Sequence, residues 1–174
     1  MKTTHIVIVA IIGLGASSGI MYASDSSEGD QNVHIEFADP ENYSDIRDGF
    51  TSSEKGEAAH LEGIEQYVQK RAKKYLPADQ KLEITFTNID LAGDFEPWGA
   101  DMDDVRIVKD IYPPRIDLQF RVRDAKGNVI KEGERKLRDL SFMMNLRLNN
   151  HDPLRYEKTL IDDWMRKDVR PTKG

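Results

Sequence analysis

The stretch RIDLQFRVRDAKGNVIKEGERKL, residues 115–137, decides the fold predicted for this chain. Apolar and polar residues alternate along its first part, which is typical of a strand with one buried and one exposed face. The apolar positions are Ile116, Leu118, Phe120 and Val122. DAKGN (124–128) follows, and its Gly127 can adopt the positive φ that a tight turn requires. Residues 129–137 then return as a second strand, so the stretch predicts a hairpin.

Two other segments alternate in the same way and predict two more strands. VHIEF (33–37) places His34 and Glu36 on its polar face. KLEITFTNIDL (81–91) has its apolar face at Leu82, Ile84 and Phe86.

A helix is predicted between these two strands. Thr51, followed three residues later by Glu54, forms a capping-box signature for its start. An apolar stripe at helical spacing then continues to Tyr75, through Leu61, Ile64, Val68 and Ala72. The basic run KRAKK (70–74) near its end suits the helix dipole, and contact with anionic lipid headgroups is the alternative interpretation.

A last helix is predicted near the C-terminus. Asp152 is a typical N-cap, Pro153 suits the first helical position, and the helix should run to about Val169. The residues of its apolar side are Leu154, Leu160, Ile161, Trp164 and Met165. The residues expected to face water are Glu157, Asp162 and Asp163.

The element order is therefore strand, helix, strand, strand, strand, helix. This order predicts an α+β fold, in which a mostly antiparallel sheet of about four strands carries two main helices packed on one face.

Composition narrows the range of functions. The chain has 174 residues, a net charge of −6 and no cysteine. An acidic chain is a poor match for nucleic acid, which attracts basic surfaces. The lack of cysteine excludes disulfides, thiolate metal sites, a cysteine nucleophile and lipid attachment through cysteine.

The first segment, MKTTHIVIVAIIGLGASSGIMYAS, is typical of a secretory signal. Lys2 precedes an uncharged run over 6–14, and small residues allow cleavage after Ser18 or Ala23. An uncleaved inner-membrane anchor is the alternative, because the uncharged stretch could just span a bilayer. We expect a periplasmic protein that meets the membrane only through this segment before cleavage. The expected organisation is a signal peptide or anchor (1–23), a flexible leader (24–31) and a single α+β domain (32–170).

The acidic stretch NIDLAGDFEPWGADMDDVR, residues 88–106, is a candidate cation site. An EF-hand loop fails at Ala92 and Gly99, which stand where a liganding oxygen and the bidentate glutamate are required. The weak metal candidates that remain are Asp101, Asp103 and Asp104. The alternative, which we favour, is that these charges are solvated or pair with Arg106, Lys109 or Arg115.

Two aromatic residues interrupt this long connection, and long loops are either functional or pinned. We expect Phe95 and Trp98 to dock on the sheet edge or under the last helix. They are also the residues expected to contact a partner, if the connection binds one.

No catalytic spacing is present in the sequence. His34, His60 and His151 are scattered and match no metal-ligand motif, and no serine lies in a nucleophile-elbow pattern. We therefore expect no catalytic residue and no cofactor.

Three passages resemble the proteobacterial envelope family called domain of unknown function 3016. They are residues 35–47, 88–122 and 150–164, and DLAG (90–93) and DPLRYEK (152–158) are the most specific blocks. The chain departs from the family pattern at Asn88, where an aspartate is expected, and at Tyr112, where a tryptophan often precedes the proline. The resemblance implies export to the periplasm and one compact domain. It implies no activity and supplies no catalytic residues.

Two functions remain open. The preferred one is a non-enzymatic binding or accessory protein of the cell envelope, which engages another envelope protein through the sheet edge or residues 93–106. A groove lined by Glu157, Ile161 and Trp164 is an alternative contact surface, although residues at such helical spacing usually form core. The second function is a metal-assisted hydrolase that uses the Asp101, Asp103 and Asp104 cluster with a distant histidine.

Overall fold

The computed structural model describes residues 32–171, apart from 50, 52, 97–104 and 145–150. Its strands are β1 (Val33–Phe37), β2 (Lys81–Asp90), β3 (Arg115–Arg123) and β4 (Val129–Arg138). Its helices are α1 (Glu54–Tyr75) and α2 (Arg155–Trp164), with short turns η1 (Pro40–Asn42), η2 (Phe142–Met144) and η3 (Met165–Val169). Within the described ranges, no helix is both long and apolar enough to cross a membrane.

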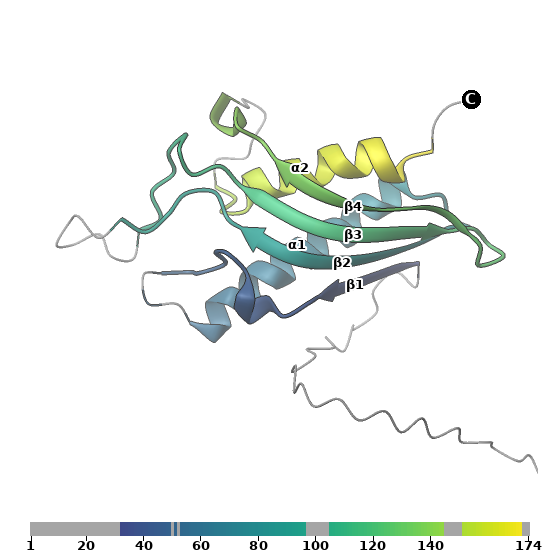
Figure 1. The fold of residues 1–174 in the computed structure, drawn as a ribbon, viewed down its shortest axis with the longest axis horizontal. Coiled ribbons are helices and arrows are strands. Elements are labelled where there is room, and N and C mark those ends of the chain that lie inside the picture. Colours follow the sequence, from purple (N-terminus) through teal and green to yellow (C-terminus); the bar gives the residue numbers. More distant parts are fainter. Residues whose placement is uncertain (1–31, 50, 52, 97–104, 145–150, 172–174) are drawn as a thin grey trace, which may run out of the picture.

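The strands form one sheet in the order β1-β2-β3-β4. β2 pairs antiparallel with β3, and β3 with β4, whereas β1 lies parallel to β2. The parallel pair arises because α1 carries the chain back across the sheet between the two strands. Figure 1 shows α1 and α2 behind the same face of this sheet. The predicted α+β architecture is confirmed.

The buried face of the two central strands forms the core with the helices. Its strand residues are at most 4% exposed, and they are Leu82, Ile84, Phe86, Ile116, Leu118, Phe120 and Val122. On the helix side, the predicted stripe of α1 is buried at Ile64, Val68, Ala72 and Tyr75. Trp164 of α2 packs edge-on against Phe120, with ring centroids 5.4 Å apart. The alternating pattern of the central strands and the helical pattern of α1 therefore predict correctly which face of each element is buried.

The start of α1 differs from the prediction of a cap at Thr51. The N-cap is Ser53, whose hydroxyl accepts a hydrogen bond from the Gly56 N–H at 3.0 Å. Asp48 accepts hydrogen bonds from the N–H and hydroxyl of Ser53, at 2.9 and 2.7 Å. Because Asp48 orients this hydroxyl, Glu54 becomes the first helical residue and not the reciprocal partner of a capping box.

The start of α2 also differs, because the helix begins at Arg155. Leu154 has non-helical φ and ψ of −99° and 19°, and its N–H donates to the Asp152 carboxylate at 3.0 Å. Asp152 therefore caps a turn that precedes the helix, and it also accepts from Lys158 Nζ at 2.7 Å. After Trp164 the chain continues as the π-helical turn η3, so the predicted end near Val169 is correct.

A polar contact joins the two helices. Arg71 of α1 forms an ion pair with Asp162 of α2, and the Tyr75 hydroxyl donates to the same carboxylate at 3.0 Å. The prediction that Asp162 simply faces water is therefore wrong, because its charge is held at the helix–helix contact.

Candidate functional site

The chain buries a group of charges where β2 ends. Asp45 lies beside this end as a one-residue parallel extension of the sheet. Its N–H donates to the Ile89 carbonyl at 3.1 Å, and its carbonyl accepts from the Leu91 N–H at 2.9 Å. This backbone pairing fixes Asp45 in the interior, where it is 7% exposed. An isolated carboxylate at such a position would be strongly destabilising unless it were paired.

Two arginines satisfy that carboxylate. Arg106 approaches it in bidentate fashion, with Nη1–Oδ2 and Nη2–Oδ1 distances of 2.9 and 3.1 Å. Arg47 donates to Oδ1 through both its backbone N–H and its Nε, each at 3.0 Å, and its Nη2 reaches Asp94 at 3.0 Å. We call Asp45, Arg47, Asp94 and Arg106 the ion cluster.

The ion cluster rests on an aromatic ring. The guanidinium carbons of Arg106 and Arg47 lie 4.6 and 5.5 Å from the ring centroid of Phe95, which is 5% exposed. A cation over an aromatic face is attracted to it, so the ring and the charges stabilise each other. Trp98 lies outside the described residues, and the expectation that Phe95 and Trp98 contact a partner stays a prediction.

The two arginines favour the ionised form of Asp45. Burial raises the pKa of Asp45, but the hydrogen bonds from Arg106 and Arg47 outweigh it and hold this pKa below the ordinary value. The pKa of Arg47 is raised, chiefly by its hydrogen bond to Asp45. Since both oxygens of Asp45 already accept hydrogen bonds from guanidinium groups, this carboxylate has no free lone pair directed at a substrate. The arrangement is suited to holding the chain together.

The chain that leaves β2 is clamped from both sides. Asp94 and Ile107 exchange backbone hydrogen bonds of 3.0 and 2.8 Å, and Lys109 Nζ pairs with Glu96 at 2.6 Å. Gly93 has a φ of 87°, and a Cβ at this position would lie 2.8 Å from the Ile107 carbonyl oxygen. The tight approach therefore requires glycine. The metal candidates Asp101, Asp103 and Asp104 belong to residues 97–104, which lie outside the described residues.

A second buried carboxylate fixes the same connection to α2. Glu157 is 1% exposed, and its Oε1 accepts from the Ala92 N–H at 2.7 Å. Its Oε2 has no hydrogen-bond partner within the described part of the chain. Burial raises the pKa of Glu157 above its ordinary value. The prediction that Glu157 faces water is wrong, because it occupies the same helix face as Ile161 and Trp164, which form core.

This hydrogen bond brings two distant passages together, since Ala92 belongs to DLAG (90–93) and Glu157 to DPLRYEK (152–158). A family model described as "Protein of unknown function (DUF3016)" matches residues 31–167. The chain belongs to this family. Searches of curated proteins and of solved structures give no match.

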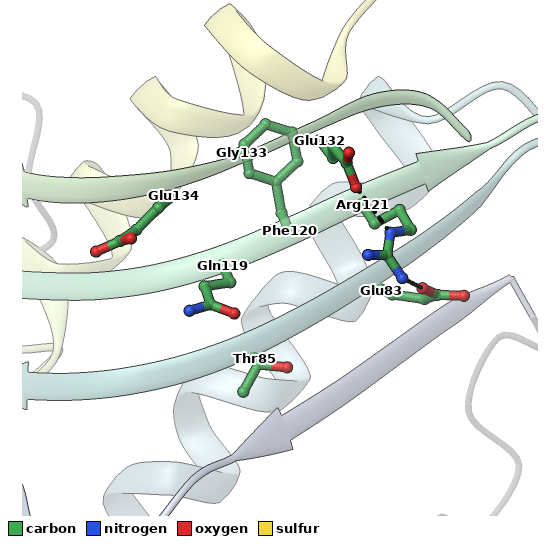
Figure 2. Close-up of a pocket in the computed structure, with 8 residues that line it drawn as sticks. All are labelled: Glu83, Thr85, Gln119, Phe120, Arg121, Glu132, Gly133 and Glu134. Atoms are coloured by element: carbon green, nitrogen blue, oxygen red, sulfur yellow. Dashed lines mark hydrogen bonds and ion pairs between the residues drawn. The ribbon is translucent and has the colours of Figure 1, made fainter.

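In this DUF3016 chain, the described helices leave the other face of the sheet uncovered. A hollow of about 420 Å³ lies on it across β2, β3 and β4. We call it the sheet hollow, and its lining residues are Glu83, Thr85, Gln119, Phe120, Arg121, Glu132, Gly133 and Glu134. Figure 2 shows the polar side chains spread over the three strands. Phe120 and Gly133 are register partners at the back of the hollow, and the Phe120 ring packs against Trp164 on the helix side of the sheet.

Charges in the sheet hollow are exposed and only partly paired. Arg121 contacts Glu132 at 3.1 Å and Glu83 at 3.7 Å, as Figure 2 shows, and Glu83 also accepts from Arg123 at 2.7 Å. The hydrogen bond from Arg123 lowers the pKa of Glu83. No described side chain pairs with the carboxylate of Glu134. The hollow therefore retains groups that can receive hydrogen bonds from outside.

His34 and His60 do not converge on one site. His34 lies on the exposed face of β1, as predicted, and His60 Nδ1 lies 2.9 Å from the Ile46 carbonyl oxygen on the other side of the molecule. Over the residues that the structure describes, no three His, Cys, Asp or Glu side chains are grouped to hold a metal ion.

The ion cluster was not predicted, because Asp45 and Arg106 are far apart in sequence and no local pattern links them. Glu157 left a signal, since it precedes Ile161 and Trp164 by about one and two helical turns and so shares their face. The sheet hollow follows from strand register, which the alternating pattern does not specify.

Proposed function

We propose that this DUF3016 chain is an exported, periplasmic, non-enzymatic binding domain, and that the open face of its sheet is the binding surface. The observation that carries the proposal is the sheet hollow on the one face that α1 and α2 leave uncovered. Ligand sites are usually concave, and the polar groups in them fix the orientation of the ligand.

The chemistry of the hollow suggests the kind of group it receives. Three of its lining residues are glutamates, and Arg121 is the only cation among them. Glu83 and Glu132 are engaged by arginines, whereas the Glu134 carboxylate pairs with no described side chain. A lysine or arginine side chain of a partner protein matches this acidic excess. We therefore propose that the ligand is an envelope protein that inserts a cationic side chain beside Glu134.

Export is proposed from the first 23 residues, whose pattern is that of a secretory signal. We expect mass spectrometry of the protein from the periplasmic fraction to find a mature chain that begins after Ser18 or Ala23. Recovery of the intact chain from the inner membrane would favour the anchor instead.

The hydrolase alternative rests on Asp101, Asp103 and Asp104, which lie outside the described residues. We retain the binding function because its surface, the sheet hollow, lies within the described residues.

Photo-cross-linking in intact cells tests the binding face. A photoreactive amino acid at Gln119, in the hollow, is expected to capture a defined protein, whereas the same probe at Lys73, on the exposed side of α1, is expected to capture none. Glu134→Lys should abolish the product, and the matched change Glu62→Lys on α1 should leave it unchanged. Equal labelling from Gln119 and Lys73 would contradict the proposal.

A further inference from the structure

The two edges of the sheet are built differently. At the β4 edge, the inward positions include Lys131 and Arg135, which pair with Asp168 of η3 at 3.6 and 2.8 Å. Charges that point inward on an edge strand disfavour the addition of another strand. At the β1 edge, the inward positions hold Val33, Ile35 and Phe37, and the polar side chains of the strand, His34 and Glu36, lie on the open face.

β1 offers unpaired backbone groups at that edge. The Asn32 carbonyl accepts from β2 at 2.8 Å, and the Ala38 N–H donates to β2 at 2.9 Å. In a parallel ladder the residues that face the neighbour alternate, so His34 and Glu36 also bond to β2. The N–H and C=O groups of residues 33, 35 and 37 therefore point to the outer side, where no described strand pairs with them.

The apolar side chains of β1 are also incompletely covered. Val33, Ile35 and Phe37 are only partly buried against the core, whereas their register partners on β2 are at most 1% exposed. The register partners are Leu82, Ile84 and Phe86. A further strand beside β1 would cover these side chains as β1 covers those of β2.

We propose that this strand is β1 of a second copy of the chain, paired antiparallel about a two-fold axis midway between the Ile35 residues of the two copies. In this register Val33 lies opposite Phe37 of the partner copy, and Ile35 lies opposite Ile35 of the partner copy. Both pairs are of the hydrogen-bonded type, because residues 33, 35 and 37 carry the outward backbone groups. On the open face, His34 lies opposite Glu36 of the partner copy, and this pair occurs twice.

The sequence of β1 matches itself only in this register. A shift by two residues places Glu36 opposite Glu36, or His34 opposite His34, and a shift by one turns the apolar side chains to the wrong face. Self-complementarity of one patch is what a two-fold homodimer requires. The dimer doubles the four-stranded sheet and places both sheet hollows on the same face. It goes beyond the proposed function, which each copy could perform alone.

Oxidative cross-linking provides the sharpest test, because the chain has no native cysteine. Residues of a hydrogen-bonded antiparallel pair have Cα atoms about 5.5 Å apart, a separation that a disulfide spans. Ile35→Cys of the purified full chain, treated with copper phenanthroline, should form a covalent dimer rapidly. Ala125→Cys, in the exposed β3–β4 turn, should remain largely monomeric.

Sedimentation equilibrium supplies the second readout. We expect wild-type protein to be dimeric at micromolar concentration. His34→Glu, which places like charges opposite each other, should weaken the dimer about tenfold or more. The reciprocal double variant His34→Glu/Glu36→His should restore it, while circular dichroism shows that each variant remains folded.

Three outcomes would overturn the proposal. The wild-type protein could be monomeric, the dimer could keep its affinity in His34→Glu, or a different protein could occupy the β1 edge. Glu134→Lys separates this inference from the proposed function, because it should abolish capture at Gln119 without changing the dimer mass.

Discussion

The end of β2 and the open face of the sheet are both rich in charge, but they use it differently. In the ion cluster, Asp45 is 7% exposed and accepts hydrogen bonds from Arg47 and Arg106 on both oxygens. On the open face, Arg121 and Glu132 are 45% and 59% exposed, and Glu134 pairs with no described side chain. Buried, saturated charges hold a structure together, whereas exposed and unsaturated charges can exchange water for a ligand. The difference indicates a structural role for the first region and supports our proposal that the second is the binding surface.

The largest expected effect comes from breaking the buried pair. Arg106→Met removes the bidentate partner of Asp45 and should lower the free energy of unfolding by about 3–5 kcal/mol, because a buried charge is left short of a partner. Arg121→Met is the matched change on the open face and should cost about 1 kcal/mol or less. Urea denaturation of both variants measures the difference. Similar decreases in the free energy of unfolding in the two variants would contradict the proposed difference between the ion cluster and the open face.

A smaller effect is expected at Gly93. Gly93→Ala forces a Cβ to within 2.8 Å of the Ile107 carbonyl at a φ of 87°, and should cost about 2–3 kcal/mol. Gly127 has a similar φ of 84° but nothing within 4 Å of the added Cβ, so Gly127→Ala should cost about 1 kcal/mol. Thermal denaturation of the pair isolates the contribution of the clamp. Equal losses of stability in the two variants would show that the positive φ, and not the contact with Ile107, makes glycine necessary at position 93.

The two buried carboxylates should respond to pH in opposite directions. The pKa of Glu157 is raised by burial, so its contribution to stability is present below the ordinary value of 4.5 and is lost as the pH rises through the folded pKa. The pKa of Asp45 is lowered, so its contribution is present above the ordinary value of 3.8 and is lost as the pH falls through the folded pKa.

Glu157→Gln should therefore be more stable than wild type at pH 8, and the advantage should shrink toward pH 4. The amide keeps an oxygen for the Ala92 N–H but carries no charge that burial penalises. Urea midpoints measured at both pH values test this. A variant that is less stable than wild type at pH 8 would mean that Glu157 has an unrecognised cationic partner.

The smallest expected effect concerns cations. We expect Ca²⁺, Mg²⁺, Mn²⁺ and Zn²⁺ to leave the Tm unchanged, because we interpret Asp101, Asp103 and Asp104 as solvated charges. A Tm increase that disappears in Asp101→Asn/Asp103→Asn would revive the hydrolase alternative.

Local periodicity explains how much of the fold could be predicted. In residues 115–137 the alternation predicts which face of the strands is buried, and in α1 the apolar stripe does the same for the helix. Both buried faces are found where predicted. The N-cap of α1 was placed two residues too early, because the hydrogen bonds that Ser53 forms with Asp48, five residues before it, match no standard capping pattern. β1 lies parallel to β2 because a helix connects the two strands. The predicted order strand, helix, strand already allowed this pairing.

The candidate sites were harder to predict, because they depend on contacts between distant segments. Asp45 acquires its role only when the chain near 45 lies beside the end of β2. The sheet hollow depends on the registers of β2, β3 and β4, which place Gln119 opposite both Thr85 and Glu134. Glu157 was wrongly predicted to face water, although the helical phase that it shares with Ile161 and Trp164 already indicated burial.

One measurement tests the central claim most directly: the cross-linking yield from two exposed positions in the same cells. A photoreactive residue at Gln119 probes the open face, and one at Ile111, which is 66% exposed, probes the connection held by the ion cluster. The account predicts a defined protein product from Gln119 and none from Ile111. A product from Ile111 alone would show that recognition occurs at the β2–β3 connection and that the open face is not the binding surface.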